Sequence, residues 1–120
     1  MNKELSPSRI YRSFLDHFVA DGMTEIPYRH NEIHKAFYEV LNENTELASK
    51  WDLRKTINPY SGKLDEMMQL FQMCGVTSID NLVDPQNIVV FDISRHANQS
   101  TEAEVEIAHK IHDSYLKLVV

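Results

Sequence analysis

Apolar residues recur at spacings of three and four in several stretches of this 120-residue chain, which is typical of helices with one buried face. The first stretch follows Ser6-Pro7, an N-cap with proline at the first helical position, and Asp21-Gly22 ends it. Thr45 is placed to cap a short third helix, and Thr101 and Glu104 form a capping box. We therefore predict helices from Pro7, over about 31–41, from Thr45, over 63–74 and from Thr101 onward.

The segment after the fourth predicted helix has the pattern of a β-hairpin. Gly75 suits the left-handed residue that follows a helix. Two apolar runs come next, Val76–Ile79 and the β-branched Ile88–Ile93, separated by a polar turn that contains a proline. Residues 53–62, by contrast, contain Asn-Pro and Ser-Gly pairs and predict irregular structure.

This order of helices, hairpin and final helix resembles the winged-helix superfamily in architecture. The resemblance is carried by LDEMMQLFQMCGV at 64–76 and by NIVVFDI at 87–93. It implies a mainly α fold of the α+β class, with a winged-helix-like helical domain over 1–95. It also implies that the C-terminal helix, within 96–120, serves dimerisation or docking. Winged-helix domains usually bind DNA or dock onto proteins.

The net charge of −6 is distributed unevenly along the chain. Residues 1–63 contain nine Lys/Arg and nine Asp/Glu, whereas residues 64–120 contain three Lys/Arg and nine Asp/Glu. Nucleic-acid affinity comes largely from Lys and Arg that displace counterions, so the acidic second half disfavours this partner. If DNA is bound, the expected contacts are Arg54, Lys55 and Lys63, which flank the approach to the fourth helix.

Two helices carry apolar residues that could bind a partner. The fourth helix is apolar on more than one side, so it is either central to the core or in contact with another protein. The last helix has apolar positions at alternating spacings of three and four, the seam of a short coiled coil, although it could equally fold back. The candidate partner-binding residues are Met67, Met68, Phe71, Ala108, Ile111, Tyr115 and Leu118.

Six histidines raise the question of a metal ion. His30 and His34 are four residues apart, but in HNEIH the glutamate does not follow the first histidine, as a zinc protease requires. His109, His112 and Asp113 form a second group. Neither group supplies a complete ligand set by spacing, so we expect no metal, no cofactor and no catalytic residue.

A single cysteine, Cys74, excludes an internal disulfide framework and suggests a reducing compartment. Its place on the apolar side of a helix predicts a buried, inert thiol. No apolar run approaches the length of a membrane span, and the first residues lack a signal-peptide pattern. We expect a cytoplasmic address and no contact with a membrane.

The preferred interpretation is a non-enzymatic protein–protein interaction module, such as a small acidic adaptor, accessory subunit or inhibitor. It would bind another protein, a second copy of itself through the C-terminal helix, or both. One alternative is a winged-helix transcriptional regulator that binds DNA through the basic residues. A second alternative is a small histidine-dependent metal protein or enzyme.

Overall fold

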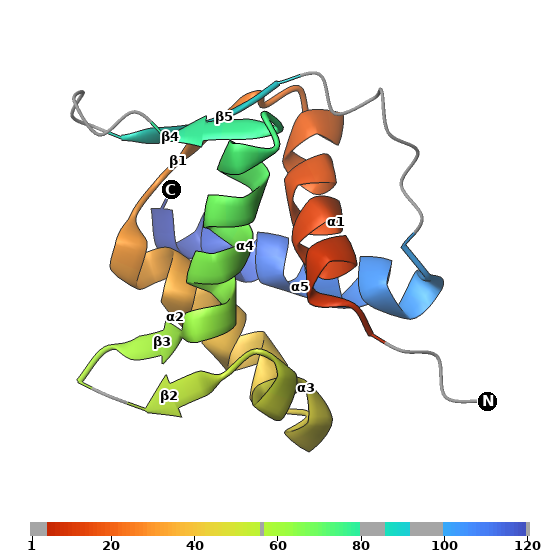
Figure 1. Cartoon of the computed structure of the whole chain (residues 1–120), viewed down its shortest axis with the longest axis vertical. Helices are drawn as coiled ribbons and strands as arrows, with labels where there is room; N and C mark the ends of the chain where they lie inside the picture. The colour runs from red at the N-terminus through yellow and green to blue at the C-terminus, as the bar shows by residue number, and fades with distance from the viewer. Residues whose placement is uncertain (1–4, 56, 80–85, 92–99, 120) are drawn as a thin grey trace.

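The computed structural model describes residues 5–55, 57–79, 86–91 and 100–119, and it has the mainly α, α+β character predicted from the sequence (Figure 1). The helices are α1 (Pro7–Ala20), α2 (His30–Leu41), α3 (Thr45–Lys50), α4 (Gly62–Met73) and α5 (Glu102–Val119). The strands are β1 (Glu25–Pro27), β2 (Leu53–Lys55), β3 (Pro59–Ser61), β4 (Thr77–Ile79) and β5 (Asn87–Val90). None of the helices in the described residues has the length and apolar content that crossing a bilayer requires.

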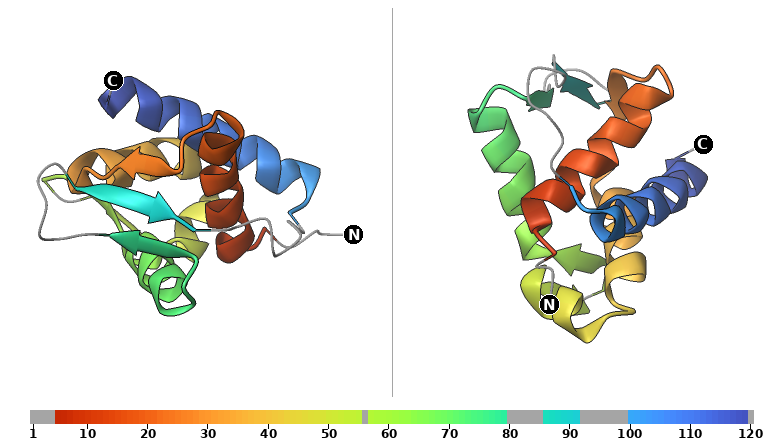
Figure 2. Two further views of the ribbon diagram at one scale, coloured as in Figure 1. Left: turned by 90° about the horizontal axis from the view of Figure 1, so that it is seen from above. Right: turned by 90° about the vertical axis from the view of Figure 1, so that its right-hand side faces the viewer.

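A three-stranded antiparallel sheet lies across one end of α1 and α4 (Figures 1 and 2). β5 is its central strand, with Ile88 paired to Ile26 of β1 and to Ile79 of β4. Ile26, Ile88 and Val90 are buried and join the sheet to the helical core. The predicted hairpin strands thus pair with each other and with β1. Residues 80–85, 92 and 93 of the predicted hairpin lie outside the described residues.

The prediction of irregular structure over residues 53–62 is wrong. β2 and β3 form a second antiparallel pair in which Leu53 faces Ser61 and Lys55 faces Pro59. Pro59 is the first residue of its strand, a position where a missing N–H is tolerated. The turn-forming residues therefore mark the ends of very short strands and do not exclude them.

The predicted helix ends are largely confirmed. Gly75 has a φ of +74°, the left-handed conformation expected after α4. At the start of α5, the Thr101 N–H donates to Glu104 Oε1 at 2.8 Å and the Glu104 N–H donates to Thr101 Oγ1 at 3.3 Å. The cap of α3 is shifted by one residue from the predicted Thr45, because the Asn44 side chain accepts from the N–H groups of Glu46 and Leu47.

The apolar face of α5 is buried in the chain's own core and does not form an exposed seam. Ala108, Ile111 and Tyr115 have no exposed surface, and Leu118 is partly buried against the same core. α5 packs across both α1 and α2, as the two views of Figure 2 show. The predicted coiled-coil residues are therefore occupied within one chain, which corrects their assignment to a partner surface.

Tyr115 anchors this packing through its hydroxyl group, which donates to the Pro27 carbonyl and accepts the Arg29 N–H at 3.1 Å. We expect Tyr115→Phe to lower the free energy of unfolding by about 1–2 kcal/mol, because two backbone groups lose a partner. Urea unfolding at two protein concentrations measures this. The loss of unfolding free energy should be equal at both protein concentrations. A urea midpoint that rises with protein concentration would contradict packing within one chain.

Tyr38→Phe is the matched control, since Tyr38 is a half-buried tyrosine on α2 whose hydroxyl has no hydrogen bond in the described part of the chain. Removing the Tyr38 hydroxyl group should change the free energy of unfolding by less than about 0.5 kcal/mol.

Candidate functional site

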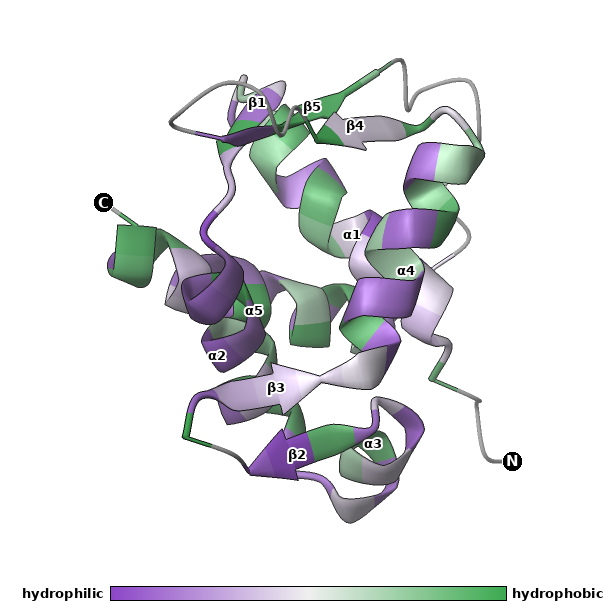
Figure 3. Cartoon of the chain, turned by 60° about the vertical axis from the view of Figure 1, so that its left-hand side comes forward, coloured by the Kyte–Doolittle hydropathy of each residue, from purple (hydrophilic) through white to green (hydrophobic). Residues whose placement is uncertain are grey.

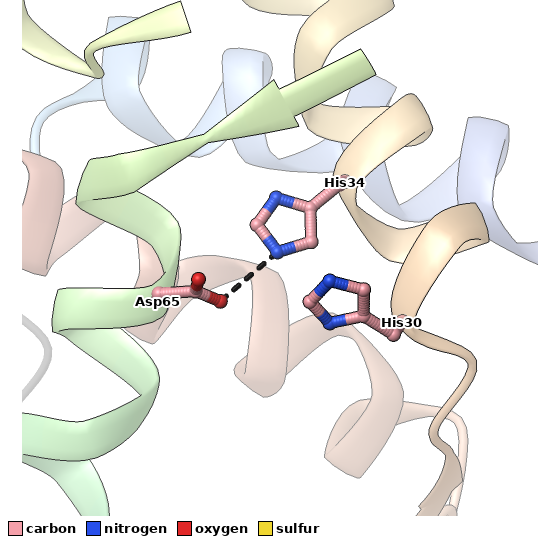
Figure 4. A group of neighbouring side chains, drawn as sticks. All are labelled: His30, His34 and Asp65. Atoms are coloured by element: carbon pink, nitrogen blue, oxygen red, sulfur yellow. Dashed lines mark hydrogen bonds and ion pairs between the residues drawn. The ribbon is translucent and has the colours of Figure 1, made fainter. Parts of the chain in front are cut away.

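A hydrogen-bonded network joins α2, β3 and α4 through one buried histidine (Figure 4). His34 Nε2 lies 3.0 Å from Asp65 Oδ1, and the Tyr60 hydroxyl donates to Asp65 Oδ2. On the other side of the ring, the Ser61 backbone N–H donates to His34 Nδ1 at 3.0 Å. Because Nδ1 accepts this bond, the proton of the neutral ring is assigned to Nε2, which donates to Asp65.

The surroundings of His34 keep its ring neutral. The residue is only 1% exposed, and the Tyr60 ring stacks on it at 4.6 Å. Burial lowers the pKa of His34, and this effect outweighs the opposing influence of Asp65. The exposed His30 lies beside it, with ring centroids 4.5 Å apart, and contacts the Tyr28 hydroxyl through Nδ1 at 3.1 Å.

This network does not offer what a metal ion or a reaction needs. His30, His34 and Asp65 each place one ligand atom within 4.8 Å of the others, which meets a distance test for a metal. The tautomer opposes it, since Nδ1 of His34 accepts a backbone N–H and Nε2 carries the proton. Neither nitrogen has a lone pair left for a metal or for a substrate proton. We therefore assign the network a structural role.

The second histidine group lies at the contact between α1 and α5. The sequence placed His109, His112 and Asp113 together, and the structure adds His17 of α1 and Asp21, the residue that follows α1. These two residues are about ninety positions from the others, so no spacing rule could have connected them. The amphipathic patterns of the two helices were the only available signal.

The methionines predicted to bind a partner belong to the core. Met67 and Met68 are 6% and 4% exposed, and the Phe71 ring meets Tyr11 edge-on at 4.8 Å. Other apolar residues of the same helix point outward instead, with Leu70 42% and Met73 78% exposed. Helix α4 is thus apolar on two sides. The predicted partner-binding residues Met67, Met68 and Phe71 lie on the buried side, and Leu70 and Met73 lie on the exposed side.

Phe91, which directly follows β5, is a further exposed apolar residue near this end of α4. It is 51% exposed, and its N–H donates to the carbonyl of Val76, just beyond the turn that ends α4, at 2.9 Å. We call Leu70, Met73 and Phe91 the α4-end patch. Figure 3 shows this end of α4 beside β4. Cys74, predicted to be buried, is exposed here because the helix ends at Met73 and turns away from the core.

The basic residues proposed for DNA are mostly engaged by neighbouring acids. Arg54 pairs with Asp52 at 2.8 Å, and its guanidinium lies 5.9 Å from the centre of the Tyr60 ring. Lys63 pairs with Glu66 at 3.1 Å. Lys55 is exposed on β2. A phosphate would have to compete with two carboxylates for this surface, which weakens it as a nucleic-acid site.

Comparison with protein-family models, with curated proteins and with solved structures found no match to this chain. The resemblance to the winged-helix superfamily accordingly stays a prediction.

Proposed function

We propose that the chain is a non-enzymatic, cytoplasmic protein–protein interaction module that contacts its partner through the α4-end patch. The observation that carries this proposal is the exposure of three large apolar side chains around one end of α4. Single exposed apolar residues are ordinary, and Ile57 and Val105 are of this kind. Several such residues grouped together mark contact surfaces more often.

The charge of the chain indicates the chemistry of the partner. The patch lies within residues 64–120, which contain nine Asp/Glu and only three Lys/Arg. We therefore expect a protein segment that presents apolar side chains flanked by Lys or Arg, attracted by complementary charge. This is the behaviour of a small acidic adaptor, accessory subunit or inhibitor.

Met73→Glu tests the proposal, with Ile57→Glu as the matched control at an exposed apolar residue away from the patch. We expect affinity capture by the natural chain to recover a stoichiometric protein that the control also recovers. With both proteins purified, Met73→Glu should weaken binding by about tenfold or more, because a charge enters the apolar contact. Isothermal titration measures this.

Three outcomes would contradict the proposal. Equal affinity of Met73→Glu and the control would remove the patch from the interface. A homodimer that sedimentation shows to be intact in both Met73→Glu and Ile57→Glu would place the protein–protein contact outside the α4-end patch. Salt-sensitive binding of a DNA duplex, lost when Arg54, Lys55 and Lys63 become alanine, would favour the transcriptional-regulator alternative.

A further inference from the structure

Helix α1 crosses α5, as Figure 2 shows. Three imidazole rings and two carboxylates, those of His17, His109, His112, Asp21 and Asp113, cluster at this crossing. We propose that His109, His112 and Asp113 bind a divalent transition-metal ion of the zinc type. This site is independent of the proposed protein contact at the end of α4. Its support comes from ligand geometry, from an unsatisfied buried nitrogen and from access to solvent.

The three residues present their ligand atoms to one point. They are spaced i, i+3 and i+4 on α5, which places them on one side of the helix. One ligand atom of each lies within 4.8 Å of the other two. The Asp113 carboxylate is between the imidazoles, 3.5 Å from His109 Nε2 and 3.1 Å from His112 Nδ1. An ion at this point could be held by two nitrogens and one oxygen.

His112 has more acidic neighbours than one ring proton can satisfy. The residue is 5% exposed, and its Nε2 lies 3.2 Å from Asp21 Oδ2 without hydrogen-bond alignment. Its Nδ1 faces Asp113 at 3.1 Å. A neutral imidazole carries one N–H, so one of its nitrogens directs a lone pair at a carboxylate. A metal ion at Nδ1 would remove this repulsion and would leave the Nε2 proton beside the Asp21 carboxylate, 3.2 Å away.

That arrangement is the one that metal-binding histidines usually adopt, with one nitrogen on the metal and the other directed at a carboxylate. His34 shows the contrast, since a backbone N–H occupies its Nδ1. No such donor to His109 or His112 is present in the described residues. The group of His30 and His34 and the group of His109 and His112 therefore have similar spacing in the sequence. They differ because only the second group leaves a lone pair available for a metal ion on both of its imidazoles.

The α1–α5 cluster is also open to an incoming ion. His109 is 59% exposed in its side chain and lines a shallow surface hollow of about 560 Å³ together with His17. The His17 ring stacks on His109 at 5.0 Å, and its Nε2 lies 3.3 Å from the Val105 carbonyl. His17 is thus a positioning residue that fixes the His109 ring. A fourth coordination position would face solvent.

The donor set selects the class of ion. Two imidazoles and one carboxylate suit zinc and its transition-metal neighbours, whereas calcium and magnesium prefer oxygen ligands. Three protein ligands with one open position give a site that holds water or an external ligand at the metal.

Isothermal titration of zinc into the metal-free full chain tests the proposal, with His109→Gln and Asp113→Asn as ligand variants and His30→Gln as the matched control. His109 and Asp113 have side chains 59% and 54% exposed, so their loss should leave the fold intact. We expect one zinc ion per chain, no binding of magnesium, and unchanged affinity for His30→Gln. Each ligand variant should weaken zinc binding by at least about tenfold, and Asp21→Asn by about 10- to 100-fold.

Thermal unfolding gives a second readout. Zinc should raise the melting temperature of the natural chain and of His30→Gln, but not that of His109→Gln. The absence of zinc binding by the natural chain would overturn the proposal. So would unchanged binding in both ligand variants, or loss of binding in His30→Gln, which would place the ion at the other histidine group.

Discussion

Replacing Glu104 by alanine is expected to lower the free energy of unfolding by about 3 kcal/mol, because it removes a buried carboxylate that several donors share. Glu104 has no exposed surface. Its oxygens accept the Ser6 N–H at 2.6 Å, the Arg9 Nε–H at 2.8 Å and the Thr101 N–H at 2.8 Å. The expected loss is at the lower end for a buried ion pair, since the Arg9 side chain is 38% exposed and can still reach water.

Glu102→Ala is the matched control, since it removes an exposed acid from the same first turn of α5. It should cost less than about 1 kcal/mol, the usual contribution of a charge at a helix start. Urea unfolding of both variants measures the difference. Equal destabilisation by the two substitutions would show that the buried carboxylate adds nothing beyond its position in the first turn.

The effect of Glu104 should also depend on pH. Burial by itself would raise the pKa of Glu104, but the hydrogen bonds from Arg9, Thr101 and Ser6 outweigh it and lower the pKa. The folded chain then binds fewer protons at this residue than the unfolded chain. Its contribution is complete above the unfolded pKa of about 4.3 and is lost as the pH falls through the folded pKa. The gap between the natural chain and Glu104→Ala should therefore narrow in acid.

The second large effect is expected at His34. His34→Ala should lower the free energy of unfolding by about 3 kcal/mol, because it leaves a cavity and deprives the Ser61 N–H of its acceptor. His30→Ala is the control, since His30 is exposed and four residues away, and it should cost less than about 0.5 kcal/mol. Urea unfolding near neutral pH compares them. A similar loss in both would mean that the buried network contributes little.

His34 should also make the fold sensitive to mild acid. Since burial lowers its pKa, the unfolded chain takes up a proton near pH 6.5 while the folded chain does not. The contribution of His34 to stability is therefore present above about pH 6.5 and is lost as the pH falls toward the folded pKa. The free energy of unfolding of His34→Ala should fall less steeply over this range than that of His30→Ala. Equal slopes would contradict the lowered pKa.

Local signals in the sequence predicted the helices because caps and apolar spacing act within a few residues. The Thr101–Glu104 box and the Gly75 stop are both present. β1 was not predicted, since three residues are too few to show alternation and their partner strand is more than sixty residues away. The β2–β3 pair was missed for a related reason, because its turn residues dominate a very short segment.

The predictions for the surface were less successful because apolar spacing does not identify what covers a helix. Ala108, Ile111 and Tyr115 have the same spacing whether they face another chain or α1 and α2. The network of His34 and Asp65 joins residues 31 positions apart, so neither has a local signature. Cys74 was predicted to lie on the buried side of the helix, but the helix ends one residue earlier, at Met73, and the thiol is exposed.

The packing of α5 against α1 has a consequence for folding during synthesis. A ribosome completes α1 long before it reaches α5. Phe14 and Phe18 therefore lack their ring contacts with Tyr115 until α5 has been synthesised. Until then α1 presents an uncovered apolar face to chaperones or to other nascent chains. Contacts between residues as far apart in sequence as those of α1 and α5 favour slow folding that is completed only after α5 is present. A stop codon between residues 95 and 100 would therefore yield an aggregating fragment instead of a smaller stable domain.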